Sequence, residues 1–249
     1  MKSTTNGGAR SSRPARPILG RAGLAAAVAA GVAAAASDAA VVTQWRFNNR
    51  SMGATVGVGT SQLVRTTHSG YVAGAAADGA GATNLSLRAG RFGAAPGAGY
   101  GVQFSTGVTG YEGVRVTYWQ LNDRSSSRWA RLQYSLNGGA FTSAGLARSG
   151  LYQITQAGIF KRISFAIPGT GALDGIDQLR FRVLAAAAPG SSQYAGTLGP
   201  YRPTGCWRLD LVSVTGTATG TTNASTPAPG AIALLGLGGA TGWGRRRRA

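Results

Sequence analysis

The chain has 249 residues, enough for one domain with its own hydrophobic core and for processing segments at the ends. It holds 40 glycines and only 13% charged residues, a composition that argues against long charged helices. About half of its formal net charge of +18 comes from the first 21 and the last five residues, so we do not expect a nucleic-acid partner.

The first 36 residues have the three-part layout of a secretory signal peptide. A basic stretch ends at Arg21, an apolar run covers residues 24–36, and small residues precede Ser37. This run is shorter than the roughly 20 residues that a permanent membrane helix needs. We therefore expect export, with the secretion machinery and signal peptidase as partners and cleavage near Ala36.

Residues 41–216 are expected to form an all-β domain, because short apolar stretches alternate with Gly, Asn, Asp and Ser turns. The clearest strands are residues 114–121 and 128–136, which we expect to be antiparallel neighbours. Asn137-Gly138-Gly139 then predicts a tight turn. Further strands are expected at residues 160–167, 178–184 and 206–214.

The order aromatic, basic, apolar, polar occurs at both ends of this domain, in Trp45-Arg46-Phe47-Asn48 and in Trp207-Arg208-Leu209-Asp210. Terminal strands that pair side by side would explain it. Alternation along each strand predicts which side chains face the core. The expected core residues are Val114, Val116, Tyr118, Ala130, Leu132, Tyr134, Leu136, Ile163, Phe165, Ile167, Leu179, Phe181, Val183, Trp207, Leu209 and Leu211.

The opposite parity places two tryptophans and several polar side chains on one face of the expected hairpin. These residues are Arg115, Thr117, Trp119, Trp129, Arg131 and Gln133. Indole rings stack on the apolar faces of sugars, and arginine or glutamine can donate to hydroxyls and carboxylates. The face is a candidate sugar-binding site. The alternative is that both tryptophans pack beneath a loop or a second layer.

Arginine provides 15 of the 16 basic residues between positions 41 and 225, against 6 acidic residues. Because arginine suits bidentate contacts with carboxylate, sulfate or phosphate, an acidic polysaccharide is a candidate partner. The alternative is that arginine is only the solubilising charge of a Gly/Ala-rich chain. Cys206 is the single cysteine, which excludes an intramolecular disulfide.

The sequence gives little sign of catalysis. It contains no nucleophile elbow, phosphate-binding loop or His-Glu-x-x-His motif. His68, the only histidine, is expected in a turn, and no pair of carboxylates stands out as an acid and base. Asp174 and Asp177 are the weak candidates for a structural calcium. We expect no cofactor and no enzyme, with a secreted polysaccharide hydrolase as the alternative.

Residues 217–225 read as a flexible linker, and residues 226–249 as a membrane-directed tail. In this tail Pro227-Ala228-Pro229-Gly230 precedes a mostly apolar run at residues 231–244. The cluster Arg245, Arg246, Arg247 and Arg248 supplies a positive cytoplasmic end. A retained membrane anchor is the alternative to a sorting signal.

The tail resembles the PEP-CTERM sorting signal of bacterial envelope proteins, with Ala228 where the family has Glu. The resemblance implies an exosortase-type membrane peptidase as a partner, removal of the tail, and delivery to the cell surface or extracellular matrix. The body is similar to the jelly-roll or concanavalin-like ectodomains of such proteins in residues 134–139, 179–182 and 207–210. The sequence thus predicts an antiparallel jelly-roll-like β-sandwich that binds acidic exopolysaccharide or has a structural role.

Overall fold

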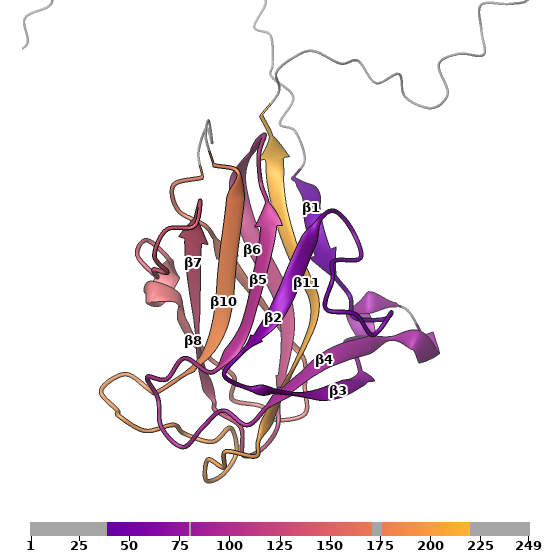
Figure 1. The fold of residues 1–249 in the computed structure, drawn as a ribbon. Helices are drawn as coiled ribbons and strands as arrows, with labels where there is room; N and C mark the ends of the chain where they lie inside the picture. Colours follow the sequence, from indigo (N-terminus) through magenta and orange to yellow (C-terminus); the bar gives the residue numbers. More distant parts are fainter. Residues whose placement is uncertain (1–38, 80, 171–175, 220–249) are drawn as a thin grey trace, which may run out of the picture. The chain divides into compact units, whose positions relative to one another are not determined.

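The computed structural model describes residues 39–79, 81–170 and 176–219 (Figure 1). The chain divides into two units, Met1–Ala36 and Ser37–Ala249. The described residues all belong to the second. The expected signal peptide, most of the expected linker and the expected sorting tail lie outside the described residues. Among the described residues, no helix is long and apolar enough to cross a membrane.

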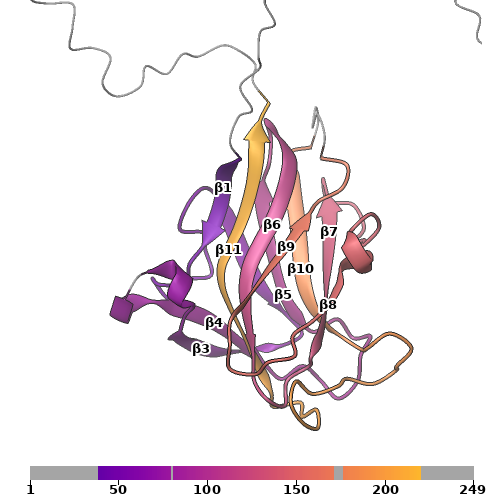
Figure 2. The ribbon, with the colours of Figure 1, turned by 180° about the vertical axis from the view of Figure 1, so that it is seen from behind.

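Two antiparallel sheets form the body (Figures 1 and 2). The first, called the β6 sheet here, has the order β3-β4-β11-β6-β9, with β1 also paired to β11. Its strands are β1 (Ala40–Trp45), β3 (Thr67–Ala73), β4 (Leu85–Gly90), β6 (Tyr111–Asn122), β9 (Lys161–Ala166) and β11 (Cys206–Ala218).

The second, called the β10 sheet, has the order β2-β5-β10-β7-β8. Its strands are β2 (Gly59–Val64), β5 (Gly101–Gly107), β7 (Trp129–Leu136), β8 (Leu151–Gln153) and β10 (Gln178–Ala186). Short 3-10 helices lie at Ala76–Asp78, Gly81–Thr83 and Ala147–Gly150. From β4 to β7, and again from β9 to β11, successive strands alternate between the sheets. The predicted all-β antiparallel sandwich is confirmed.

The core lies between the two inner faces and is built around aromatic side chains. Phe104 stacks on Phe181 with ring centroids 5.0 Å apart, and Trp45 packs edge-on against Phe104 at 5.1 Å. Trp207 is fully buried against Phe92. All but three of the expected core residues are buried. Leu136 and Ile163 are partly buried and pack against this cluster, and Leu211 does not belong to it.

Leu211 was assigned to the core wrongly, because β11 contains a bulge. Its register shifts between Asp210 and Ser213 against β6, and Leu211 adopts φ 45°. The extra residue reverses the alternation, so Val212 and Val214 become the fully buried positions. A prediction that assumes strict alternation of buried and exposed residues along a strand cannot anticipate this shift.

The terminal strands do pair. β1 runs antiparallel to β11 from Ala40 opposite Gly216 to Trp45 opposite Val212. The predicted turn is also present, since Asn137 and Gly138 both have positive φ and Gly139 N donates to Leu136 O at 2.9 Å.

The expected hairpin between residues 114–121 and 128–136 is wrong. β6 belongs to one sheet and β7 to the other, and the connection at residues 123–128 crosses between them. Buried side chains fix this crossing: Asn122 Nδ2 donates to Ser127 O at 2.9 Å, as does Trp207 Nε1 at 3.0 Å. These bonds anchor the connection to the core and carry the chain from one sheet to the other.

Two smaller expectations also need correction. His68 belongs to strand β3 rather than to a turn, and Thr217 and Ala218 continue β11 instead of beginning the linker. Cys206 is a free, buried thiol.

Candidate functional site

The outer face of the β10 sheet carries a row of polar side chains that crosses four strands. Strand register places Gln62 of β2 opposite Gln103 of β5, and Gln103 opposite Arg182 of β10. Arg182 in turn lies opposite Gln133 of β7. These positions alternate with buried ones such as Phe181, so the row faces away from the core.

Arg182 stands at the centre of this row in a fixed arrangement. Its Nε donates to Gln133 Oε1 at 2.8 Å, and its guanidinium lies 4.0 Å from the ring centroid of Phe141. A cation held over an aromatic face is stabilised by the ring quadrupole. Partial burial lowers the pKa of Arg182 from its usual value, but arginine stays charged at neutral pH.

Arg180 lies two residues earlier on the same face of β10. Its guanidinium is 5.3 Å from the same Phe141 ring, and its Nη2 donates to Ser135 Oγ at 3.1 Å and to Gly139 O at 3.2 Å. Neither Arg180 nor Arg182 forms an ion pair with a carboxylate among the residues described. One aromatic ring therefore holds two adjacent cations that lack an anionic partner there.

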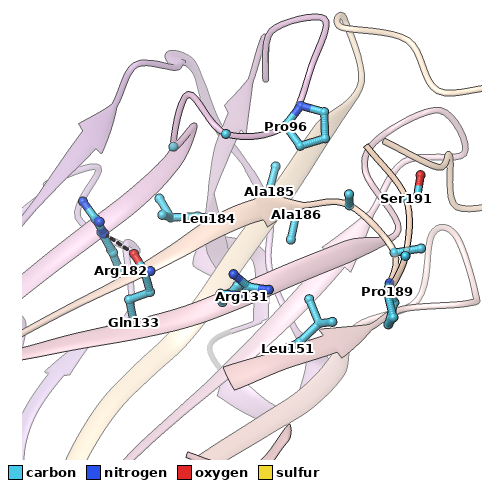
Figure 3. Close-up of a pocket in the computed structure, with 15 residues that line it drawn as sticks. Pro96, Arg131, Gln133, Leu151, Arg182, Leu184, Ala185, Ala186, Pro189 and Ser191 are labelled. Atoms are coloured by element: carbon cyan, nitrogen blue, oxygen red, sulfur yellow. Dashed lines mark hydrogen bonds between the residues drawn. The ribbon is translucent and has the colours of Figure 1, made fainter. Parts of the chain in front are cut away.

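A groove of about 460 Å³, of which Arg182 is a lining residue, lies on the same face (Figure 3). Its floor comes from the β10 sheet and its sides from the β4–β5 connection and the segment after β10. Arg131 projects from β7 between Leu184 and Leu151, its partners in the register. The lining residues are Pro96, Gly97, Gly99, Arg131, Gln133, Leu151, Arg182, Leu184, Ala185, Ala186, Ala187, Ala188, Pro189, Gly190 and Ser191. The groove thus combines an apolar floor with two arginines and an amide.

The residues predicted as one sugar-binding face are divided between the two sheets. Arg131 and Gln133 line the groove, and Trp129 lies on the same outer face, half-buried, opposite Ala186 and Gln153. Their common face with β6 was inferred from a hairpin that does not form, so the prediction of a single site is wrong.

Arg115, Thr117 and Trp119 lie on the outer face of the β6 sheet. Arg115 is exposed, and its Nη1 donates to Ser164 Oγ at 3.2 Å. Trp119 is half-buried and lies opposite Asp210 and Arg162 in the register. The two tryptophans therefore do not form one platform.

Sequence reasoning missed Arg180, Arg182 and Phe141 as site residues. The alternation in Leu179-Arg180-Phe181-Arg182 already placed both arginines opposite the core. Phe141 gave no comparable signal, because it follows the Asn137-Gly138 turn outside any named strand. Its contact with β10 becomes visible only when Thr142 pairs with Tyr134 at the edge of β7.

None of the carboxylates among the described residues is part of the groove lining. Asp177 accepts a hydrogen bond from Thr109 Oγ1 at 3.0 Å, and its expected calcium partner Asp174 lies outside the described residues. Asp78 and Asp210 have buried side chains close to one another, and Asp210 accepts a hydrogen bond from Ala75 N. Within the described part of the chain, no three acidic, histidine or cysteine side chains gather as metal ligands.

No protein-family profile and no curated protein sequence matches the chain. Among solved structures, it is similar to the tandem CBM22-1–CBM22-2 domain of Paenibacillus barcinonensis Xyn10C. The TM-score is 0.44 at 15% identity over 76% of this chain and 52% of that one, so the chain spans about half of the tandem structure.

The single CBM22-2 xylan-binding domain from the same enzyme gives a TM-score of 0.42 at 16% identity, covering 70% of this chain and 98% of that one. The K3 adhesin domain of Lys-gingipain from Porphyromonas gingivalis gives 0.35 at 14% identity, covering 71% and 100%.

Proposed function

We propose that the β-sandwich is a non-catalytic carbohydrate-binding module of an exported protein, and that it takes an acidic polysaccharide in the groove of the β10 sheet. The observation that carries this proposal is the pair Arg180 and Arg182, held by Phe141 beside the groove without a carboxylate partner among the described residues. An anionic ligand would neutralise these cations.

The chemistry of the groove suits a sugar chain bearing carboxylates. Guanidinium groups bind carboxylate in bidentate fashion, and glutamine amides donate to or accept from hydroxyl groups. Leu151 beside Arg131, together with Ala187 and Ala188 in the groove lining, offers partly exposed apolar surface for the C–H faces of the rings. The row from Gln62 to Gln133 crosses four neighbouring strands. At a strand spacing of about 4.8 Å, it is long enough to contact more than one sugar unit.

The test is direct binding of a polyuronate and of a neutral glucan of similar length, measured calorimetrically with the purified chain. We expect the polyuronate to bind, and its binding to weaken as NaCl rises from low to high concentration, because salt screens exposed charges. Equal binding of the neutral glucan, with no effect of salt, would contradict the acidic-ligand proposal. Absence of binding to both would contradict the carbohydrate-binding function itself.

We further propose that residues 1–36 direct export and that residues 226–249 are processed by an exosortase-type peptidase, which leaves the module at the cell surface or in the extracellular matrix. The support is the three-part N-terminal layout and the Pro227-Ala228-Pro229 motif followed by an apolar run and Arg245 to Arg248. Both segments lie outside the described residues.

Neutral replacement of Arg245 to Arg248 removes the positive cytoplasmic end of the tail. The variant should be mislocalised or left uncleaved, while the sandwich still folds. Mass spectrometry of the surface-released wild-type protein is the second readout. A peptide that reaches Ala249 would show that Pro227-Ala228-Pro229 is not a processing signal.

A further inference from the structure

Asp210 occupies a junction in the β6 sheet. Along one edge of β11, residues Cys206–Leu209 pair with β4, whereas β1 pairs from Val212 onward. Asp210 lies at the bulge between these two partners. Its side chain is fully buried, with Oδ2 accepting from Ala75 N and Oδ1 from Leu211 N, both at 2.7 Å.

A second buried carboxylate lies close by. The side chain of Asp78 is 0% exposed, although its loop is at the surface. Asn48 Nδ2 donates to Asp78 Oδ2, and Asn48 Oδ1 accepts from Leu85 N at 2.7 Å, which fixes the orientation of that amide. Asp78 Oδ1 is buried and accepts no hydrogen bond from any of the described residues.

Asn84 adds a third oxygen. Its Nδ2 donates to Ala75 O at 2.6 Å, and its Oδ1 is buried with no hydrogen-bond donor among the residues that the structure describes. A Cβ atom built on Gly74 would collide with both Asn84 Oδ1 and Asp210 Oδ2. The two oxygens therefore approach each other beside Gly74, where the side chain of any other residue would displace them.

The charges of this cluster do not balance. The only cation paired with its two carboxylates in the described structure is Arg46, whose Nη1 is 3.5 Å from Asp78 Oδ1 and whose side chain is 44% exposed. Asp210 itself has two backbone N–H donors and no ion pair with a cation among the described residues. Buried carboxylates without sufficient positive charge are costly, and a bound cation removes that cost.

We propose that Asp78, Asn84 and Asp210 form a calcium site that ties residues 74–79 and 81–84 to strand β11. Calcium accepts carboxylate, amide and carbonyl oxygens in flexible geometry and needs no third acidic ligand. Arg46 can yield its place beside Asp78, because its Nε also donates to Gln44 Oε1 at 2.7 Å on the exposed face. This site is separate from the groove and independent of the function proposed for it.

The test is thermal unfolding of the purified full chain after removal of metal with a chelator, in titrations with CaCl₂ and MgCl₂. Calcium at about 100 times its Kd should raise Tm by roughly 5–10 °C. Magnesium should shift Tm much less, because it demands a tighter octahedral shell. Equilibrium dialysis should return one calcium per chain. Identical Tm values with and without calcium, and no retained calcium, would overturn the proposal.

Variants locate the site. Asp210→Asn and Asp78→Asn should abolish most of the calcium-dependent rise in Tm, and Asn84→Ala should weaken calcium binding by on the order of 10-fold. Asp123→Asn, which removes the same charge from the turn after β6, is the matched control and should respond as wild type. Asp210→Asn also disturbs two backbone hydrogen bonds, so a misfolded variant leaves Asn84→Ala as the deciding one. An unchanged calcium response in Asn84→Ala and Asp78→Asn would place the ion elsewhere and refute the assignment.

Discussion

The two outer faces of the sandwich both carry arginines, but they hold them differently. On the β6 sheet, Arg115 is exposed and its one hydrogen bond described is to the hydroxyl of Ser164. On the β10 sheet, Arg182 is fixed by Gln133 and by the ring of Phe141, beside a groove. Side chains already held in one rotamer lose less entropy on binding. The comparison shows that the β10 face differs from the β6 face in the contacts that hold its arginine and in the groove beside it. The presence of a positive charge does not distinguish the two faces.

The largest expected effect separates the inner from the outer positions of β10. Phe181→Ala removes a ring that stacks on Phe104 and packs against Trp45, and should cost about 3–5 kcal/mol of unfolding free energy. Its outward neighbour Arg182→Gln should change that free energy by less than about 1 kcal/mol. Urea denaturation of both variants gives the comparison. Similar losses would mean that the two positions do not differ in burial as described.

The alternation of Phe181 and Arg182 was readable from the sequence, and so were the all-β class, the Asn137-Gly138 turn and most of the core. Periodicity tells which side of a strand is buried, but not which sheet the strand joins. The crossing at residues 123–128 depends on long-range bonds such as that from Trp207 to Ser127. For this reason the sequence placed Trp119 beside Trp129, although they lie on different sheets.

The groove could not have been predicted from local pattern at all. Its sides come from residues 96–99 and 187–191, which lie in two connections far apart in the chain. The bulge at Leu211 also depends on tertiary pairing. The extra residue in β11 lies where the neighbouring strand changes from β4 to β1. The groove and the bulge depend on which strands pair in the folded chain, so no hydrophobic periodicity in the sequence predicts them.

An intermediate effect is expected from the ring that clamps the two arginines. Phe141→Ala should weaken polyuronate binding by roughly 5-fold, which corresponds to about 1 kcal/mol of cation–π stabilisation. Phe141→Leu should weaken it equally, since leucine keeps apolar bulk but has no quadrupole. Calorimetric titration of both variants is the measurement. Full recovery of affinity with leucine would show that the ring acts by bulk alone.

The smallest expected effect lies at the far end of the polar row. Gln62→Ala should reduce polyuronate affinity about 2- to 3-fold, as expected for one hydrogen bond worth roughly 0.5 kcal/mol. Gln153→Ala on β8, an exposed glutamine outside the row, is the matched control and should leave affinity unchanged. If both substitutions have the same effect, the ligand does not follow the row as far as β2.

The most direct test of the central claim compares one arginine from each face, as Arg182→Gln and Arg115→Gln, in calorimetric titrations with the same polyuronate. Each substitution removes one positive charge from an outer strand position. Arg182→Gln should weaken binding roughly 10- to 100-fold, because a hydrogen bond to a charged group contributes about 1.5–3 kcal/mol. Arg115→Gln should change affinity less than about 2-fold, through screened long-range charge alone. Equal losses for the two variants would contradict the assignment of the binding site to the β10 sheet.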